Sequence, residues 1–307
     1  MRRAANTQRI YPYDWLIIGY SVSMLILITL FGRPLQEYAD ELLFYSGTAV
    51  LAAVLARYLT EDSGSAQRFI RLLYPMLLFT LFYRMTGGTM FLVFDRFFDS
   101  QLTGLEQRIL GVEPSLSFDH YLPNTLVTEL LSFSYFSYYF MIPVFFLVTF
   151  FSRRYDVIKR SMTAICMMFF VSYLLFVLYP IEGPRWHFAE LYTNSITGPF
   201  FRPLVDLVIA NGAVRGGCMP SSHVGVALVV LVYSLRQDRR IGWFLVPINL
   251  GLAAGTVWGR FHYVSDVVVG AAIGIISVLL VDRYYPRFAP ANTEQQTSRE
   301  VVYHNAS

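Results

Sequence analysis

The chain has 307 residues, of which 55% are hydrophobic, 17% aromatic and only 15% charged, and its formal net charge is +3. Apolar residues in long blocks are typical of membrane-spanning proteins and exclude an ordinary soluble domain. The small net charge gives no indication of nucleic-acid binding. The two cysteines, Cys166 and Cys218, exclude a disulfide framework and a CxxC metal site.

Apolar windows of about 17 to 25 residues, long enough to cross a bilayer, predict helical spans. They lie near 14–32, 42–60, 71–94, 126–151, 161–180, 221–235, 241–258 and 264–282, the sixth being short. The third holds Arg84 and Gly87-Gly88, which favour a kink or a partly re-entrant segment. We therefore expect an all-α fold, a polytopic membrane helix bundle of about eight spans.

These spans organise the chain into one transmembrane domain, residues 14–288, after a cytoplasmic N-terminus, 1–13. The polar tail, 289–307, is predicted to be disordered and cytoplasmic. Residues 95–125 mix apolar and charged side chains at near-helical spacing, so we expect an amphipathic helix on the outer surface, covering the flank of the site.

The distribution of basic residues predicts the orientation, because cytoplasmic connections are rich in lysine and arginine. With the N-terminus inside, every inner connection is basic, and with an even number of spans both termini are cytoplasmic. The inner basic residues are Arg2, Arg3, Arg9, Arg57, Arg68, Arg71, Arg153, Arg154, Lys159, Arg160, Arg236, Arg239, Arg240, Arg283 and Arg287. The outer connections are balanced by acids, namely Glu37, Asp40, Glu41, Asp95, Asp99, Glu106, Glu113 and Asp119.

Four arginines break this pattern because they lie on the predicted outer side. Arg185, Arg202 and Arg215 lie between the fifth and sixth spans, and Arg260 lies at the outer end of the seventh. Arginine side chains can extend to lipid headgroups, or the four can form a pocket for an anionic group. Their positions alone leave both explanations open.

Two histidines stand in patterns that suit phosphate chemistry. The first is His223 in Pro220-Ser221-Ser222-His223, directly before an apolar run. Proline and serine there predict a helix start capped by Ser221 or Ser222. A helix start offers free N–H groups and the positive end of the helix dipole, which together attract phosphate. His223 would lie in the first turn and face the anion.

The second is His262, four residues before Asp266 and two after Arg260. On a helix, His262 and Asp266 share one face and can form a hydrogen bond. A carboxylate on one imidazole nitrogen selects the tautomer and leaves the other nitrogen free to attack or to accept a proton. The sixth span runs inward from His223 and the seventh returns outward to His262, so both histidines are predicted on the same side of the membrane.

Pro220-Ser221-Ser222-His223 followed by His262-xxx-Asp266 resembles the second and third signature motifs of the type 2 phosphatidic acid phosphatase superfamily. Arg260-Phe261-His262-Tyr263 resembles its inositol phosphorylceramide synthase-like branch, whose members are inositolphosphotransferases. The resemblance covers roughly residues 179–282, about a third of the chain. It implies a core six-helix bundle and a place in phospholipid or sphingolipid metabolism.

The resemblance also implies roles for these residues in a metal-independent reaction without a cofactor. His262 would attack phosphorus and form a phosphohistidine, with Asp266 orienting it. His223 would protonate the leaving oxygen and later activate water or an acceptor hydroxyl. Ser221, Ser222 and the arginines would neutralise the charge of the phosphate.

The sequence departs from the family in its first motif, a lysine followed seven positions later by Arg-Pro. The only lysine, Lys159, lies on the predicted cytoplasmic side. Arg185 is the favoured replacement, with Arg202 second. The arginine usually found six residues before the nucleophile is Thr256 here, so Arg260 would take its place.

We therefore expect an integral membrane enzyme at the outer face of a bacterial cytoplasmic membrane. Its substrate would be a lipid phosphomonoester, diphosphate or phospho-headgroup, and the acceptor would be water or a lipid alcohol. The diverged first motif and the third motif favour transfer to an alcohol. A non-enzymatic transporter or lipid-binding protein could use the same polar cluster, but it predicts charges near mid-membrane. A haem between the histidines would leave Asp266 and the arginines unused.

Overall fold

The computed structural model describes residues 10–59 and 64–288. Most of the predicted cytoplasmic N-terminus, 1–13, and all of the predicted disordered tail, 289–307, lie outside these ranges. Within them there is no β-strand, and one isolated bridge joins Ile181 to Gly217. The all-α fold class is confirmed.

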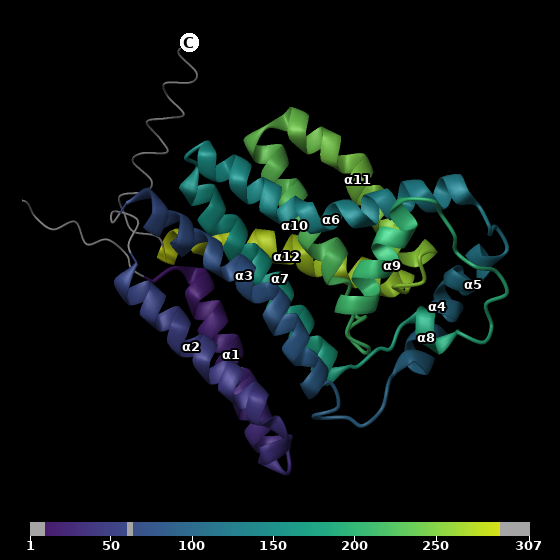
Figure 1. Ribbon diagram of the computed structural model, residues 1–307, viewed down its shortest axis with the longest axis horizontal. Coiled ribbons are helices and arrows are strands. Elements are labelled where there is room, and N and C mark those ends of the chain that lie inside the picture. The colour runs from purple at the N-terminus through teal and green to yellow at the C-terminus, as the bar shows by residue number, and fades with distance from the viewer. Residues whose placement is uncertain (1–9, 60–63, 289–307) are drawn as a thin grey trace, which may run out of the picture.

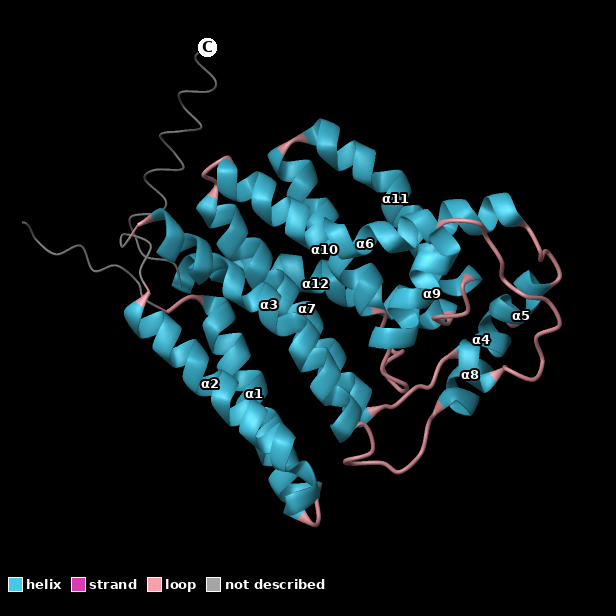
Figure 2. Cartoon of the chain, viewed as in Figure 1, coloured by secondary structure: helices cyan, strands magenta, loops and turns pink. Residues whose placement is uncertain are grey.

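Twelve α-helices and one short 3-10 helix make up the described part of the chain (Figures 1 and 2). In chain order they are α1 (Pro12–Phe31), η1 (Leu35–Tyr38), α2 (Ala39–Tyr58), α3 (Ser65–Thr89), α4 (Asp99–Leu110), α5 (Pro114–Asp119), α6 (Thr125–Phe151), α7 (Tyr155–Leu178), α8 (Pro184–His187), α9 (Phe201–Gly212), α10 (Ser222–Gln237), α11 (Arg239–Trp258) and α12 (Val264–Phe288).

Six segments of the described chain are long and apolar enough to cross a membrane: α1, η1 with α2, α6, α7, α11 and α12. α10 is apolar but has only 16 residues. α3, which carries Arg68, Arg71 and Arg84, is not among the six, and it continues as a helix through Gly87-Gly88. The membrane helix bundle is therefore confirmed, while the count of eight spans and the cytoplasmic termini stay predictions.

The bundle is built around α7, the most buried of the six spanning helices. α7 packs against α1, α3, α10 and α12, and α11 packs against α6 and α10. In Figure 1 the α1–α2 hairpin, in purple, lies on one side, and α4, α5 and α8 gather at the other. We call the segment from α4 to α5, which the charge distribution predicts on the outer side, the outer lobe. α10, which carries His223, and α12, which begins just after His262, lie between these two extremes.

A buried ion pair joins α1 to α3. Arg71 Nη1 donates to Asp14 Oδ1 over 2.9 Å, Nη2 pairs with the other oxygen, and neither side chain reaches solvent. Tyr74 donates a further hydrogen bond to Asp14. Breaking such a buried pair by removing one partner costs about 3–5 kcal/mol. Arg71 therefore links α1 to α3. The predicted orientation then depends on the other basic residues of the inner connections.

α10 and α12 approach closely where both helices carry glycine. A Cβ on Gly270 would lie 2.3 Å from the carbonyl oxygen of Ser221, and one on Gly274 would lie 2.5 Å from that of Gly225. Contact at these distances requires residues without a side chain. The glycines therefore allow the N-terminal halves of α10 and α12 to pack backbone against backbone.

Gly270→Ala is expected to destabilise the protein by about 1–3 kcal/mol, because an added methyl group in a closely packed contact forces the backbone apart. Thermal unfolding of the purified protein in detergent measures the effect. Gly104→Ala is the matched control, since a Cβ at this position in α4 meets nothing within 4 Å and alanine favours a helix. Equal loss of stability in both variants would contradict the close-packing explanation.

Candidate active site

His223 lies in the first turn of α10. Ser221 caps the helix, and its Oγ accepts the Val224 N–H over 3.5 Å. The His223 ring packs against Tyr135 and Tyr138 of α6, with ring centroids 5.3 and 4.6 Å away. Its Nε2 lies 3.5 Å from the Tyr135 hydroxyl, while Nδ1 is buried with no hydrogen-bond partner in the described chain. One nitrogen of this ring is therefore available to a bound molecule.

His262 lies in the short connection between α11 and α12 and is 5% exposed. Its Nδ1 is 3.3 Å from Oδ2 of Asp266 in the first turn of α12. The same carboxylate oxygen accepts the Tyr263 N–H over 2.8 Å. The pair that the spacing predicts is present, but it forms across the start of α12 and not along one helical face. Because Asp266 engages Nδ1, Nε2 is left for a substrate.

The two histidines meet although 39 positions separate them. Their ring centroids are 6.0 Å apart and their planes are inclined at 60°. The Ser221 N–H donates to the Asp266 carbonyl oxygen over 2.9 Å, which ties the start of α10 to the start of α12. Reacting atoms must come within about 3–3.5 Å of each other. Two rings at this separation can therefore contact opposite sides of one phosphoryl group.

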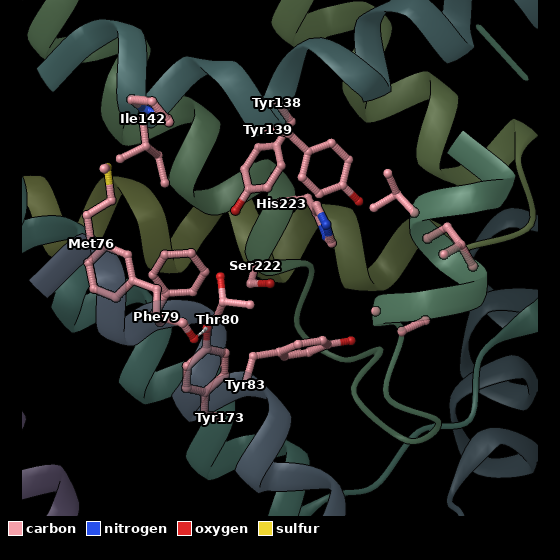
Figure 3. Close-up of a pocket in the computed structure, with 16 residues that line it drawn as sticks. Met76, Phe79, Thr80, Tyr83, Tyr138, Tyr139, Ile142, Tyr173, Ser222 and His223 are labelled. Carbon is pink, nitrogen blue, oxygen red and sulfur yellow. Dashed lines mark hydrogen bonds between the residues drawn. The ribbon is translucent and has the colours of Figure 1, made fainter. Parts of the chain in front are cut away.

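A cavity of about 490 Å³ opens beside His223. It is lined mainly by aromatic and aliphatic side chains of α3, α6, α7 and α9. The residues labelled in Figure 3 are Met76, Phe79, Thr80, Tyr83, Tyr138, Tyr139, Ile142, Tyr173, Ser222 and His223. Figure 3 shows Tyr138 and Tyr139 above His223, with Ser222 beside it and Met76 farther away. An apolar cavity next to an imidazole suits a lipid chain. We call it the apolar cavity.

A second cavity, of about 340 Å³, is lined by three of the four arginines that are predicted on the outer side. Arg185 comes from α8, Arg202 from α9 and Arg260 from the connection that also carries His262. The other lining residues are Ala189, Tyr192, Thr193, Asn194, Ser195, Ile196 and Gly259. Three guanidinium groups around one hollow attract anions. We call it the arginine cavity.

Arg260 is held in place from several sides. Its Nη2 donates to Asp119 Oδ1 and, over 2.7 Å, to the Asn194 carbonyl oxygen. Its Cζ lies 3.7 Å from the centroid of the Tyr192 ring. The backbone φ of Arg260 is +63°, a left-handed conformation that is uncommon outside glycine. Such a conformation persists only where the surroundings enforce it, so the direction of this guanidinium is set before any ligand binds.

The remaining arginines differ in their partners. Arg202 forms two hydrogen bonds to Asp206, of 3.0 and 2.8 Å, and its Cζ lies 5.5 Å from the centroid of the Phe261 ring. Arg185 lies over the Trp186 ring at 5.2 Å. Arg215 pairs with Glu182 and does not line the arginine cavity. The structure therefore brings together three of the four arginines that the sequence singled out.

Asp99 of the outer lobe holds two loops of the site, a role that no pattern in the sequence indicates. Its two carboxylate oxygens accept the N–H groups of Glu182 and Gly183 over 2.8 Å each. The Tyr263 hydroxyl donates to Oδ1 over 2.9 Å. One buried carboxylate thus joins the segment before Arg185 to the residue after His262.

Two further acids of the outer lobe act in the same way. Glu106 accepts the Ser265 N–H, and Asp119 accepts the Thr193 N–H over 2.9 Å and its hydroxyl over 2.7 Å. Burial alone would raise the pKa of Asp119, but the bonds from Thr193 and the charge of Arg260 hold it below its ordinary value. The contacts of Asp99, Glu106 and Asp119 link the outer lobe to the loops of the site. The sequence predicts that this segment covers the flank of the site.

Cys218 completes a cluster with the His262–Asp266 pair. Its Sγ donates to Asp266 Oδ2 over 2.9 Å and lies 3.4 Å from His262 Nδ1. Among the described residues, these three side chains form the one group of histidine, cysteine and acidic residues whose ligand atoms are close enough to hold a metal ion. Burial raises the pKa of the Cys218 thiol well above its ordinary value, so the thiol keeps its proton at neutral pH.

Comparison with known families covers more than half of the chain. A family model described as the PAP2 superfamily matches residues 100–280, from α4 into α12. Every candidate site residue lies inside the match, and α1, α2 and α3 lie outside it.

Individual relatives match shorter segments. Undecaprenyl-diphosphatase BcrC of Bacillus subtilis is 30% identical over 92 residues, which are 30% of this chain and 47% of the relative. A PA-phosphatase related-family protein of Dictyostelium discoideum is 24% identical over 122 residues, 38% of this chain and 22% of the relative. The chain thus aligns with less than half the length of either protein. No solved structure matches it significantly.

Proposed function

Because the chain belongs to the PAP2 superfamily, and thus to a family of membrane lipid phosphatases, we propose that it cleaves a lipid phosphate or diphosphate through a phosphohistidine on His262. The placement of His223 and His262, with ring centroids 6.0 Å apart, carries the proposal. The apolar cavity beside His223 and the arginine cavity that includes Arg260 supply places for the two halves of such a substrate.

The proposed reaction has two steps. Nε2 of His262 attacks phosphorus while Asp266 holds the Nδ1 proton, and the bond from phosphorus to the lipid oxygen breaks. His223 gives its proton to that oxygen as it leaves. In the second step His223 takes a proton from water, the hydroxide attacks the phosphohistidine, and the bond to His262 breaks. The protein returns to its starting protonation state. Because histidine side chains supply the nucleophile, the acid and the base in this scheme, it needs no metal, and activity should persist in chelator.

The charge of the transferred group needs stabilisation throughout. We propose that Arg185, Arg202 and Arg260 bind its oxygens, with the Ser221 and Ser222 hydroxyls and the N-terminus of α10 as further donors. Arg185 would replace the missing lysine of the first family motif.

Transfer of the phosphoryl group or headgroup to a lipid alcohol is the second candidate. The diverged first motif and the Arg260-Phe261-His262-Tyr263 sequence favour it, because the latter resembles the inositolphosphotransferase branch. Its first half-reaction is the same, and the two candidates differ only in the molecule that His223 activates in the second step.

A panel of lipid phosphates, diphosphates and phospho-headgroup lipids, incubated with purified protein with and without lipid alcohols, tests the proposal. Release of inorganic phosphate without an alcohol supports hydrolysis. Appearance of a headgroup-bearing lipid only with an alcohol supports transfer. If no member of the panel is turned over, the non-enzymatic transporter or lipid-binding function is favoured.

The proposed outer location of the site makes a separate prediction. Both natural cysteines are buried, so a thiol reagent should react mainly with an exposed cysteine that is introduced by mutation. Ser100→Cys in the outer lobe should react with a membrane-impermeant maleimide on intact cells, whereas Ser152→Cys, at the end of α6, should react only after permeabilisation. Both serines are exposed. The reverse pattern would contradict the predicted orientation.

A further inference from the structure

The triangle of Cys218 Sγ, His262 Nδ1 and Asp266 Oδ2 has nearly the dimensions of one face of a zinc site. With bonds of about 2.0–2.1 Å to nitrogen or oxygen and about 2.3 Å to sulfur, tetrahedral geometry separates ligand atoms by about 3.3 to 3.6 Å. The Nδ1–Oδ2 distance is 3.3 Å and the Sγ–Nδ1 distance is 3.4 Å. The Sγ–Oδ2 distance is 2.9 Å, so this edge must open by about 0.7 Å.

A second observation points to the same place. Asp266 is fully buried, and its Oδ1 has no hydrogen-bond partner in the described chain. Buried carboxylate oxygens are normally paired, and an unpaired one marks a place where an unobserved group can bind. Oδ1 can serve as a further ligand atom, or can take over the hydrogen bond from Tyr263 N that Oδ2 now accepts.

We propose that Cys218, His262 and Asp266 bind Zn²⁺ and that the bound ion inhibits the protein. Thiolate, imidazole and carboxylate are the three ligand types that zinc uses in proteins. Cys218 makes the site specific to a thiolate-binding metal, since the other two ligands alone would not distinguish zinc from harder ions.

Inhibition follows from the position of one proton, and this part rests on the proposed function. Neutral His262 carries its proton on Nδ1, next to Asp266, and keeps a lone pair on Nε2 for the attack on phosphorus. Zinc takes Nδ1 as a ligand, so that proton moves to Nε2, which can then no longer attack. The thiol of Cys218 loses its proton to solvent. The net balance is one ion bound and about one proton released.

Cobalt(II) binding to the purified protein tests the site without any assay of turnover. A thiolate–cobalt bond gives an intense near-ultraviolet charge-transfer band, which zinc should abolish by displacement. The band should appear in the wild-type protein and in Cys166→Ser, whose missing thiol lies in α7. It should be lost in Cys218→Ser and weakened in His262→Ala. No band in the wild-type protein, or one that persists in Cys218→Ser, would overturn the proposed site.

Inhibition is measured separately, as the zinc concentration that halves the turnover of each variant relative to its own zinc-free rate. We expect Cys218→Ser to raise this concentration by more than about tenfold, since even loss of an outer-shell partner has an effect of that size. Chelator should restore the wild-type rate. A cobalt band without zinc inhibition would keep the site but refute its inhibitory role, and would count against His262 as the nucleophile. Zinc inhibition that is unchanged in Cys218→Ser would place the inhibitory ion elsewhere.

Discussion

His262→Ala is expected to lower turnover of any lipid phosphate that the protein cleaves by roughly 10⁴ to 10⁶-fold. In hydrolases that use a covalent intermediate, removal of the nucleophile has an effect of this order. Neither the Nδ1 contact with Asp266 nor the free Nε2 has a substitute, because the next imidazole, His223, has its ring centroid 6.0 Å away. Release of inorganic phosphate by the purified variant, over a long incubation, measures the loss.

Two controls separate lost chemistry from lost structure. His120→Ala makes the same change at an exposed histidine that follows α5, and should retain full turnover. An alkaline quench of the wild-type protein during turnover should trap a base-stable phosphohistidine, which the His262→Ala protein should lack. Residual activity above a few per cent in a folded His262→Ala protein would remove His262 as the nucleophile.

The sequence predicts the helical framework well because apolar blocks determine it locally. The first window, 14–32, corresponds to α1 (Pro12–Phe31), and each of the other seven windows also overlaps one helix. The status of α3 and α10 as spans is harder to predict. Their length and charge place them near the limit of what can cross a membrane. Tertiary contacts such as the Arg71–Asp14 pair also change the free-energy cost of burying a charged residue in a span.

The histidines could be found from the sequence because the chain has only five of them, and the four arginines because they break the predicted distribution of basic residues. Ser221 and Pro220 mark the start of a helix, and the spacing of His262 and Asp266 predicts contact. The spacing suggests a shared helical face, whereas His262 precedes α12 and the carboxylate reaches back across the helix start. Local patterns thus predict that two residues are in contact, but they predict the geometry of the contact less well.

The outer lobe shows what local patterns cannot predict. Asp99, Glu106 and Asp119 hold backbone and side-chain groups that lie 74 to 164 positions away. In the sequence they are acids in an amphipathic segment and contribute only to the charge balance of an outer connection. No spacing rule connects a carboxylate to a loop so far along the chain. The contacts of Cys218 could not be predicted for the same reason, since 44 to 48 positions separate it from His262 and Asp266.

His223→Gln is expected to lower turnover of a lipid phosphate by about 10² to 10⁴-fold, the usual contribution of a general acid and base. Glutamine retains polar contacts near Tyr135 and Tyr138 but cannot exchange a proton. In the proposed first step the missing proton matters only when the leaving oxygen is basic. A nitrophenyl phosphate ester carries a leaving group that departs without a proton, so the first step with this ester should remain fast in the variant.

The two steps can then be separated in one experiment. Because His223 is also proposed to activate water, the variant should release about one nitrophenol per protein in a rapid burst and then turn over slowly as the phosphohistidine accumulates. Tyr135→Phe is the matched control: it removes the hydroxyl 3.5 Å from His223 Nε2 but keeps the ring packing, and should cleave both esters at near wild-type rates. If His223→Gln loses the burst and slows equally on the two esters, the ring serves to position the substrate, and another group must transfer the proton.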